Sequence, residues 1–277
     1  MKINKTLYRL LVAILTVTLL VSGFFVVRYF MGSSQQKEKY DELAALVEEA
    51  RKETLPSEPG VQVRPAEPES TETPAPTEPV MLAEYAALYE KNPDTVGWIT
   101  IEGTPVNYPV MQTPDRTDYY LNRNFSKEQS AQGCIYVRET CDVFTPSDNV
   151  TIYGHHMKDG SMFGSLKKFQ KKSFWEEHHS INFDTLYERH TYTVFAVFAT
   201  SASVGQGFAY HSFEYAEDVA DFDDFIATCK KLSFYDTGIT PEYGDKIICL
   251  STCEYTHTDG RLVVVAVRDP EAPADSK

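Results

Sequence analysis

The amino-acid sequence predicts a mostly β fold, a barrel or sandwich of antiparallel strands with a few inserted helices. Roughly seven short runs rich in β-branched and aromatic residues follow one another after residue 94. Turn signals such as Asp259-Gly260 separate several of these runs. Two helical pieces, residues 161–169 and 218–232, lie between them. Many strands with so few helices favour a barrel or a sandwich.

Helix and strand patterns follow one another along this predicted domain. Residues 81–91 have the apolar spacing of an amphipathic helix, and so do residues 218–232. Two strand-like runs, 95–101 and 105–111, flank a Glu-Gly-Thr turn and predict a hairpin. The later runs are short and rich in β-branched residues: 133–137, 149–154, 192–200, 245–252 and 261–268.

The N-terminal region predicts a membrane anchor. Residues 7–30 are mostly apolar, and Leu10 to Val27 carries no charge, which is about the length that crosses a bilayer core. A cleaved signal peptide would have a shorter apolar region and an Ala-x-Ala-like site. We therefore expect residues 1–6 in the cytoplasm and the rest of a single-pass protein outside the cell membrane.

A spacer is predicted between the anchor and the β domain, over residues 31–79. Residues 36–53 have helical character and are expected to form a solvated stalk. Residues 54–79 are rich in Pro, Glu, Thr and Ser, which cannot bury enough apolar surface to fold. The globular domain is then expected over residues 80–270, with a flexible tail at 271–277.

Composition excludes some partners and cofactors. The formal net charge of −14 argues against a nucleic-acid partner. The five cysteines form no CxxC pair or zinc spacing, so we expect no metal and no cofactor. Because five is an odd number, at least one thiol must stay unpaired within the chain.

The segment LSTCEYTHTDGR combines a cysteine and an arginine in a way that indicates chemistry. It joins two strand-like runs through a turn, so Cys253 and Arg261 are expected opposite each other in an antiparallel hairpin. Cross-strand neighbours have Cβ atoms about 4.5–5.5 Å apart. A nearby positive charge favours the thiolate, which is the nucleophilic form. The alternative is a purely structural role, in which Arg261 caps a sheet edge or pairs with Glu254.

Any of seven histidines could be the acid/base partner of such a thiol, and their sequence contexts differ. His155 and His156 follow a predicted strand, where functional side chains often project from a rigid frame. His178 and His179 are expected on a solvated helical face, and His257 lies in the turn. The two His-His pairs do not predict a metal site, because neighbouring residues on a strand point to opposite faces.

Cys134 is a competing nucleophile. The stretch SAQGCIYVR resembles the SxGC-then-Arg signature of L,D-transpeptidases. The match is poor, because the serine lies one residue too far upstream, the arginine two residues too late, and the upstream His-Gly is missing. We therefore expect Cys134 to be a strand residue without a catalytic role.

Two motifs together resemble the sortase family. Leu250 to Cys253 followed by Arg261 resembles the TLxTC…R signature, with Cys249 where threonine is usual, and Tyr153-Gly154-His155 resembles the strand-end histidine. The stretches TVGWITIEGTPVNYPVMQ, DYYLNRNF and IYGHHMKDGSMFGSL look specifically like class B sortases. The resemblance implies a closed β-barrel of about eight strands with inserted helices, preceded by a transmembrane helix and a spacer.

The same resemblance implies a function and a set of site residues. Sortases are cysteine transpeptidases that cut a C-terminal sorting signal of surface proteins after threonine. They join the new carboxyl to an amine of a peptidoglycan precursor or a pilin. By this resemblance Cys253 is the nucleophile, His155 the general acid/base and Arg261 the oxyanion-stabilising residue. The resemblance also implies substrate-binding positions: Leu121, Tyr153, Tyr210, Ser251 and Glu254.

Two other functions stay open from the sequence. One is a non-catalytic surface module that binds peptides, and the other is a cysteine peptidase that transfers only to water. Cys249 raises a separate question, because residues 249 and 253 share a strand face. About 13 Å of strand separates them at 3.3 Å per residue, which exceeds the roughly 7 Å limit on Cα separation for a disulfide. We therefore predict that Cys249 is a buried free thiol.

Overall fold

The computed structural model describes residues 5–54, 79–203, 205–254 and 259–270. These residues belong to two compact units, 1–42 and 43–277. Most of the predicted unfolded spacer and the whole predicted tail lie outside the described residues, and so does His257.

Helix α1 (Lys5–Thr54) includes all the described residues of the first unit, and its last residues, from 43 on, belong to the second. Within the part of the chain that the structure describes, no helix combines the length and the apolar character that a membrane crossing requires. The anchor expected over residues 7–30 stays a prediction. The side chains of residues 25–34, which include part of that segment, lie outside the described residues.

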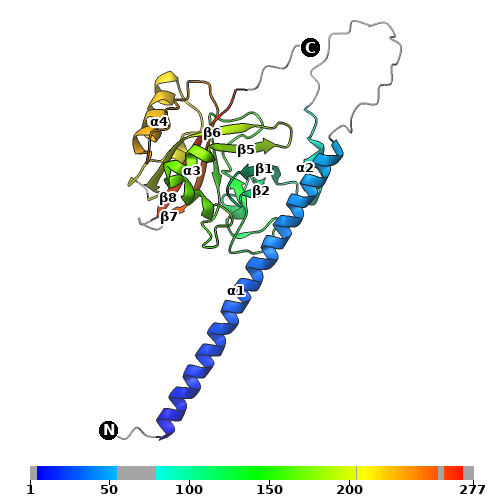
Figure 1. The fold of residues 1–277 in the computed structure, drawn as a ribbon, viewed down its shortest axis with the longest axis vertical. Coiled ribbons are helices and arrows are strands. Elements are labelled where there is room, and N and C mark those ends of the chain that lie inside the picture. The colour runs from blue at the N-terminus through cyan, green and yellow to red at the C-terminus, as the bar shows by residue number, and fades with distance from the viewer. Residues whose placement is uncertain (1–4, 55–78, 204, 255–258, 271–277) are drawn as a thin grey trace, which may run out of the picture. The chain divides into compact units, whose positions relative to one another are not determined.

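The second unit is built on a closed barrel of eight strands, which confirms the predicted fold (Figure 1). The strands follow the order β1-β2-β3-β4-β7-β8-β6-β5 around the barrel. Two neighbouring pairs, β2 with β3 and β4 with β7, are parallel, and the others are antiparallel. The strands are β1 (Thr95–Ile101), β2 (Asn107–Met111), β3 (Ile135–Val137), β4 (Asn149–Tyr153), β5 (Ser180–Thr185), β6 (Thr191–Ser201), β7 (Ile247–Glu254) and β8 (Gly260–Arg268).

Strand β5 was not predicted from the sequence. The predicted solvated helix around His178 and His179 is shorter than expected, because α3 (Lys172–Glu177) ends before both histidines. Ile181 and Phe183 then alternate with polar residues and are buried against β1 and β6. This strand is short, and its polar residues continue the polar helical stretch that precedes it. The apolar periodicity of the sequence therefore did not reveal β5.

The remaining helices are short pieces around the barrel. The structure has α2 (Ala83–Lys91) and α4 (Val219–Leu232) where amphipathic helices were predicted. The stretch predicted as helix at 161–169 is instead a 3-10 helix, η2 (Gly164–Gln170). Two further 3-10 turns are η1 (Tyr119–Asn122) and η3 (Tyr210–Ser212).

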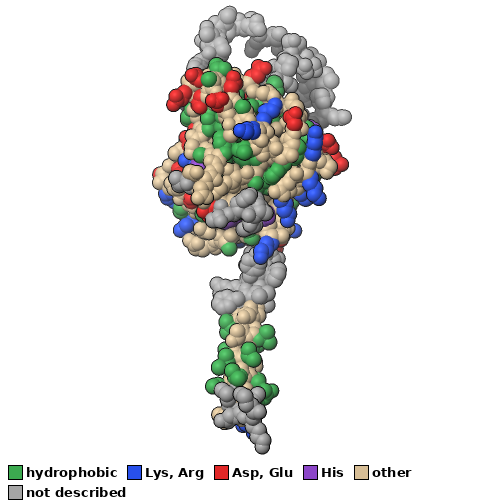
Figure 2. Space-filling model, turned by 90° about the vertical axis from the view of Figure 1, so that its left-hand side faces the viewer, with side chains coloured by type: hydrophobic (Ala, Val, Ile, Leu, Met, Phe, Trp, Pro, Cys, Tyr) green, Lys and Arg blue, Asp and Glu red, His purple; other side chains and the backbone are tan. Residues whose placement is uncertain are grey.

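Helix α4 begins where the sequence supplies a cap. The Asp218 side chain accepts a hydrogen bond of 3.0 Å from the backbone N–H of Asp221, which satisfies one of the helix's open donors. The acidic side chain of Asp221 in the first turn also interacts favourably with the positive end of the helix dipole. Figure 2 shows acidic side chains gathered at the upper margin of one face, so the negative charge is concentrated locally.

An apolar layer between α4 and the barrel positions one face of β7. Phe222, Phe225 and Cys229 of α4 pack with Cys249 of β7 and with residues of β6 and β8. Cys249 is fully buried and unbridged, which confirms the prediction of a buried free thiol. Burial raises the pKa of this thiol well above its ordinary value, so it stays protonated and inert.

The end of α1 packs against the barrel, so the prediction of a fully solvated stalk is wrong there. Val47 is buried, and the Arg51 guanidinium donates to the Asp184 carboxylate at 2.8 Å and to the Tyr85 hydroxyl. Burial raises the pKa of the Asp184 carboxyl, and the positive charge of Arg51 opposes that shift. The physical reason is that a buried carboxylate needs a charged or polar partner, and Arg51 of α1 supplies a positive charge.

We expect Arg51→Ala to lower the free energy of unfolding by about 1–2 kcal/mol, because Asp184 loses a charged donor. Partial exposure of Arg51 keeps the effect below that of a fully buried pair. Lys52→Ala is the matched control: that side chain is largely exposed and pairs with Glu48, so its loss should cost less than about 0.5 kcal/mol. Urea unfolding measures the free energy of unfolding of both variants. Equal values for Arg51→Ala and Lys52→Ala would contradict the docking of α1.

Candidate functional site

Strands β7 and β8 bring the predicted cysteine and arginine together. Cys253 and Arg261 are register partners in the antiparallel ladder, as the hairpin pattern predicted. Arg261 is held in place by its own turn, because its guanidinium donates to the Gly260 carbonyl at 3.0 Å. Asp259 adopts a left-handed backbone conformation, with φ of 51°, which turns the chain into β8. A partly exposed thiol therefore lies beside a fixed positive charge.

Strand β4 brings the predicted histidine to the same edge of the barrel. It runs parallel to β7, with Tyr153 opposite Ser251, and the Gly154 N–H extends the ladder by donating to the Ser251 carbonyl at 3.1 Å. A Cβ atom at Gly154 would lie 2.5 Å from Cδ1 of Ile135 and 2.7 Å from the ring of Phe163, so a larger residue would require these side chains to shift. His155 comes next, and because a carbonyl only accepts, its Nε2–H donates to the Leu121 carbonyl at 2.7 Å.

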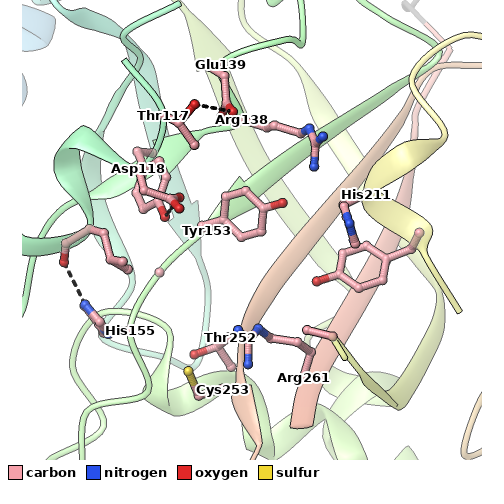
Figure 3. Close-up of a pocket in the computed structure, with 15 residues that line it drawn as sticks. Thr117, Asp118, Arg138, Glu139, Tyr153, His155, His211, Thr252, Cys253 and Arg261 are labelled. Atoms are coloured by element: carbon pink, nitrogen blue, oxygen red, sulfur yellow. Dashed lines mark hydrogen bonds between the residues drawn. The ribbon is translucent and has the colours of Figure 1, made fainter. Parts of the chain in front are cut away.

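These residues surround one cavity of about 280 Å³ (Figure 3). Six of the predicted site residues line it: Cys253, His155, Arg261, Leu121, Tyr153 and Tyr210. In Figure 3 the side chains of Cys253 and Arg261 lie at one end of the cavity, and Arg138 lies toward the other. The cavity therefore extends from the thiol past the ring of Tyr153, which lines its wall.

Two predicted substrate-binding residues are not among the described residues that line the cavity. Ser251 is buried and does not line the cavity; its hydroxyl shares a hydrogen bond of 2.6 Å with the hydroxyl of Tyr210. We interpret it as a support for Tyr210, which faces the cavity. Glu254 is the last residue of β7, and its side chain lies outside the described residues. The roles assigned to individual residues stay predictions.

Several lining residues were not predicted from the sequence. Arg138 bonds to Glu214 across 3.1 Å, and Asp118 accepts a hydrogen bond of 2.8 Å from the Tyr136 hydroxyl. His211 also lines the cavity; burial, together with the charges of Arg138 and Arg261, lowers its pKa. The only sequence signal was positional, because Arg138 directly follows a strand and polar residues at strand ends often face a site. The other unpredicted lining residues are Thr117, Tyr136, Glu139, Gly154, Ala202 and Thr252.

Tyr153 and Tyr210, two of the three tyrosines that line the cavity, remain protonated near neutral pH. Burial raises the pKa of Tyr153 to about 12, although Arg138 partly opposes this. Burial also raises the pKa of Tyr210. Neither hydroxyl can therefore act as a base near neutral pH.

The competing nucleophile does not reach the cavity. Cys134 lies just before β3, is buried and is not among the lining residues. Cys141 and Cys229 are buried as well, and burial raises the pKa of Cys141 to about 11. Cys253 is the only one of the five cysteines that is partly exposed.

A partly exposed thiol beside an arginine, with a histidine at the same edge of a closed barrel, defines a cysteine enzyme of the acyl-transfer class. A sortase domain model matches residues 99–269, and the chain therefore belongs to the sortase family. The enzymes of this family are cysteine transpeptidases, and the relatives below indicate class B.

The chain is similar to characterised class B enzymes over most of its length. It is 29% identical to sortase B of Staphylococcus aureus over 255 residues, which cover 91% of this chain and 93% of that protein. It is 36% identical to sortase B of Listeria monocytogenes over 185 residues, or 65% of this chain and 72% of that one.

Solved structures agree with this assignment. A Staphylococcus aureus sortase B–substrate complex matches with a TM-score of 0.72 at 27% identity, covering 87% of this chain and 100% of that chain. Sortase B from B. anthracis matches with a TM-score of 0.66 at 32% identity, covering 86% of this chain and 98% of that chain.

We expect iodoacetamide to modify Cys253 alone in the native chain, because the other four thiols are buried. Peptide mapping should locate one carbamidomethyl group at Cys253, and unfolding in urea should expose all five cysteines. Cys253→Ala should show no native modification. Modification of Cys134 in the native protein would contradict the buried position of that thiol.

Proposed function

We propose that this chain is a membrane-anchored sortase that cleaves a C-terminal sorting signal after threonine and transfers the protein to a cell-wall amino group. The observation that carries the proposal is the pairing of Cys253 with Arg261 in one cavity with His155. The similar Staphylococcus aureus structure is a substrate complex, which supports a substrate in the corresponding cavity here.

Acylation uses the thiol and the arginine together. The Cys253 thiolate attacks the threonine carbonyl carbon, and the negative charge moves to the carbonyl oxygen. Arg261 and the backbone N–H of Glu254 donate to this oxygen and stabilise it. The carbon–nitrogen bond then breaks, His155 protonates the departing amine, and a thioester to Cys253 remains.

The orientation of His155 decides which of its nitrogens exchanges the proton. Its Nε2–H is engaged by the Leu121 carbonyl, so Nδ1 is the atom left for proton transfer. Once His155 has given a proton to the leaving amine, its neutral Nδ1 accepts one from the incoming amine. That amine attacks the thioester, a new amide forms, and the Cys253 thiolate leaves.

The sorting-signal mechanism can be tested by incubating the purified chain with a panel of peptides carrying sorting signals. We expect a thioester adduct on Cys253 in intact-protein mass spectra and its absence in Cys253→Ala. Arg261→Ala should lower kcat/KM about 10²–10³-fold, because an oxyanion donor is lost.

Arg268→Ala is the matched control, because this arginine lies at the other end of β8 and does not line the cavity. An adduct that persists in Cys253→Ala would move the nucleophile elsewhere. Release of product to water, without joining to an added amine, would favour a peptidase over a transpeptidase. An intact protein that forms no adduct with any peptide would favour a binding module.

The membrane attachment is supported by the N-terminal helix. Leu10 to Val27 contains no charged residue. The hydroxyls of Thr16 and Thr18 donate to the carbonyls of Val12 and Ile14 at 2.8 and 2.9 Å, and such bonds satisfy polar groups in hydrocarbon. The N-terminus is then cytoplasmic and the barrel extracellular.

We expect the full chain to stay in the membrane fraction after washing with high salt and to dissolve in detergent, because its anchor is apolar. Removal of residues 1–30 should release it. Protease added outside intact cells should digest the barrel unit. A full chain that leaves the membrane on salt washing would refute the anchor.

A further inference from the structure

A second histidine bonds to the backbone of the nucleophile. Nδ1 of His156 lies 2.9 Å from the carbonyl oxygen of Cys253. A carbonyl oxygen can only accept a hydrogen bond, so Nδ1 carries the proton and donates it. The ring is half-buried, and it is not among the residues that line the cavity.

The place of this bond follows from the pairing of β4 with β7. Hydrogen bonds in a parallel ladder are evenly spaced and use alternate residues of each strand. Gly154 N–H donates to the Ser251 carbonyl, so the next bond would run from the backbone N–H of His156 to the Cys253 carbonyl. Beyond Gly154 the chain instead forms an isolated antiparallel bridge to the segment around Met162, in which the Phe163 N–H donates to the His155 carbonyl at 3.0 Å. At this point it is the ring of His156 that donates to the Cys253 carbonyl.

This bond joins the two strand ends that carry the reacting groups. His156 is covalently attached to His155, and its ring holds the residue that supplies the thiol. Arg261 pairs with Cys253 from the opposite side of β7. We infer that His156 is a positioning residue for acyl transfer, whose Nδ1–H fixes Cys253 relative to His155. The inference rests on the proposed function, because it concerns the same thiol and the same histidine.

The bond also acts on the oxyanion site. The Cys253 carbonyl and the Glu254 N–H belong to one peptide group, so a donor on the carbonyl polarises that group. Linked hydrogen bonds strengthen one another in this way. His156 therefore makes the Glu254 N–H a better donor to the developing oxyanion, and loss of the bond should affect the chemical step more than peptide binding.

Three substitutions test whether the hydrogen bond donated by His156, rather than its imidazole ring as such, is what matters. The amide nitrogen of His156→Asn lies one bond beyond Cγ, as Nδ1 does, so it can still donate. His156→Asp has nearly the same shape, but its carboxylate only accepts and repels the carbonyl. His179→Asp is the matched control, because His179 is exposed and lies outside the cavity.

We expect His156→Asp to lower kcat for peptide turnover about 10–100-fold, because small misplacement of reacting groups is costly. KM should change less than about threefold, the pattern of an interaction used in the transition state. His156→Asn and His179→Asp should stay within about threefold of wild type. A fully active His156→Asp, or an Asn variant as damaged as the Asp variant, would overturn the inference.

Cys253→Ala in the same assay distinguishes the two proposals. If it retains turnover, the proposed function fails; if it is inactive while His156→Asp is fully active, only the positioning role fails. A second measurement needs no peptide. In the full chain with ¹⁵N-labelled histidine, the His156 signals, assigned by their loss in His156→Asn, should show a proton on Nδ1 at neutral pH. A bare Nδ1 would overturn the inference.

Discussion

The parallel pairing of β4 with β7 is the constraint on which the active site depends. Parallel neighbours end at the same edge of a sheet, so the residues that follow β4 meet the residues that end β7. His156 and Cys253 are 97 positions apart in sequence, yet they share a hydrogen bond. A parallel connection also needs a long crossover, and here the crossover supplies β5, β6 and α4. One pairing therefore explains both the site and much of the barrel.

The layer that covers β7 determines which of its thiols can react. Cys249, Ser251 and Cys253 alternate onto one face of the strand. The first lies under α4, and the second bonds to Tyr210 of η3. Cys253 follows, where the strand reaches the cavity. The same strand face thus changes from apolar core to reactive site over a few residues, because the covering layer ends.

The sequence was sufficient for the parts of the site that local pattern determines. The turn at Asp259-Gly260 set the register of Cys253 with Arg261, and β-branched runs marked most strands. Arg138 and His211 were not predicted, because they reach the cavity only after the barrel closes. The docking of Arg51 onto Asp184 joins residues 133 positions apart, and no local pattern reports such a contact. The family resemblance, rather than periodicity, singled out His155.

The burial of four of the five cysteines has a consequence for oxidation. A thiolate that reaches solvent is the form that oxidants convert to a sulfenic acid. Many redox-sensitive proteins repair this lesion with a neighbouring thiol that forms a disulfide. Here all five cysteines are described, and the other four are enclosed in the core. An oxidised Cys253 must therefore be recovered by a reductant from outside the protein, so the activity of this enzyme depends on the thiol chemistry of its surroundings.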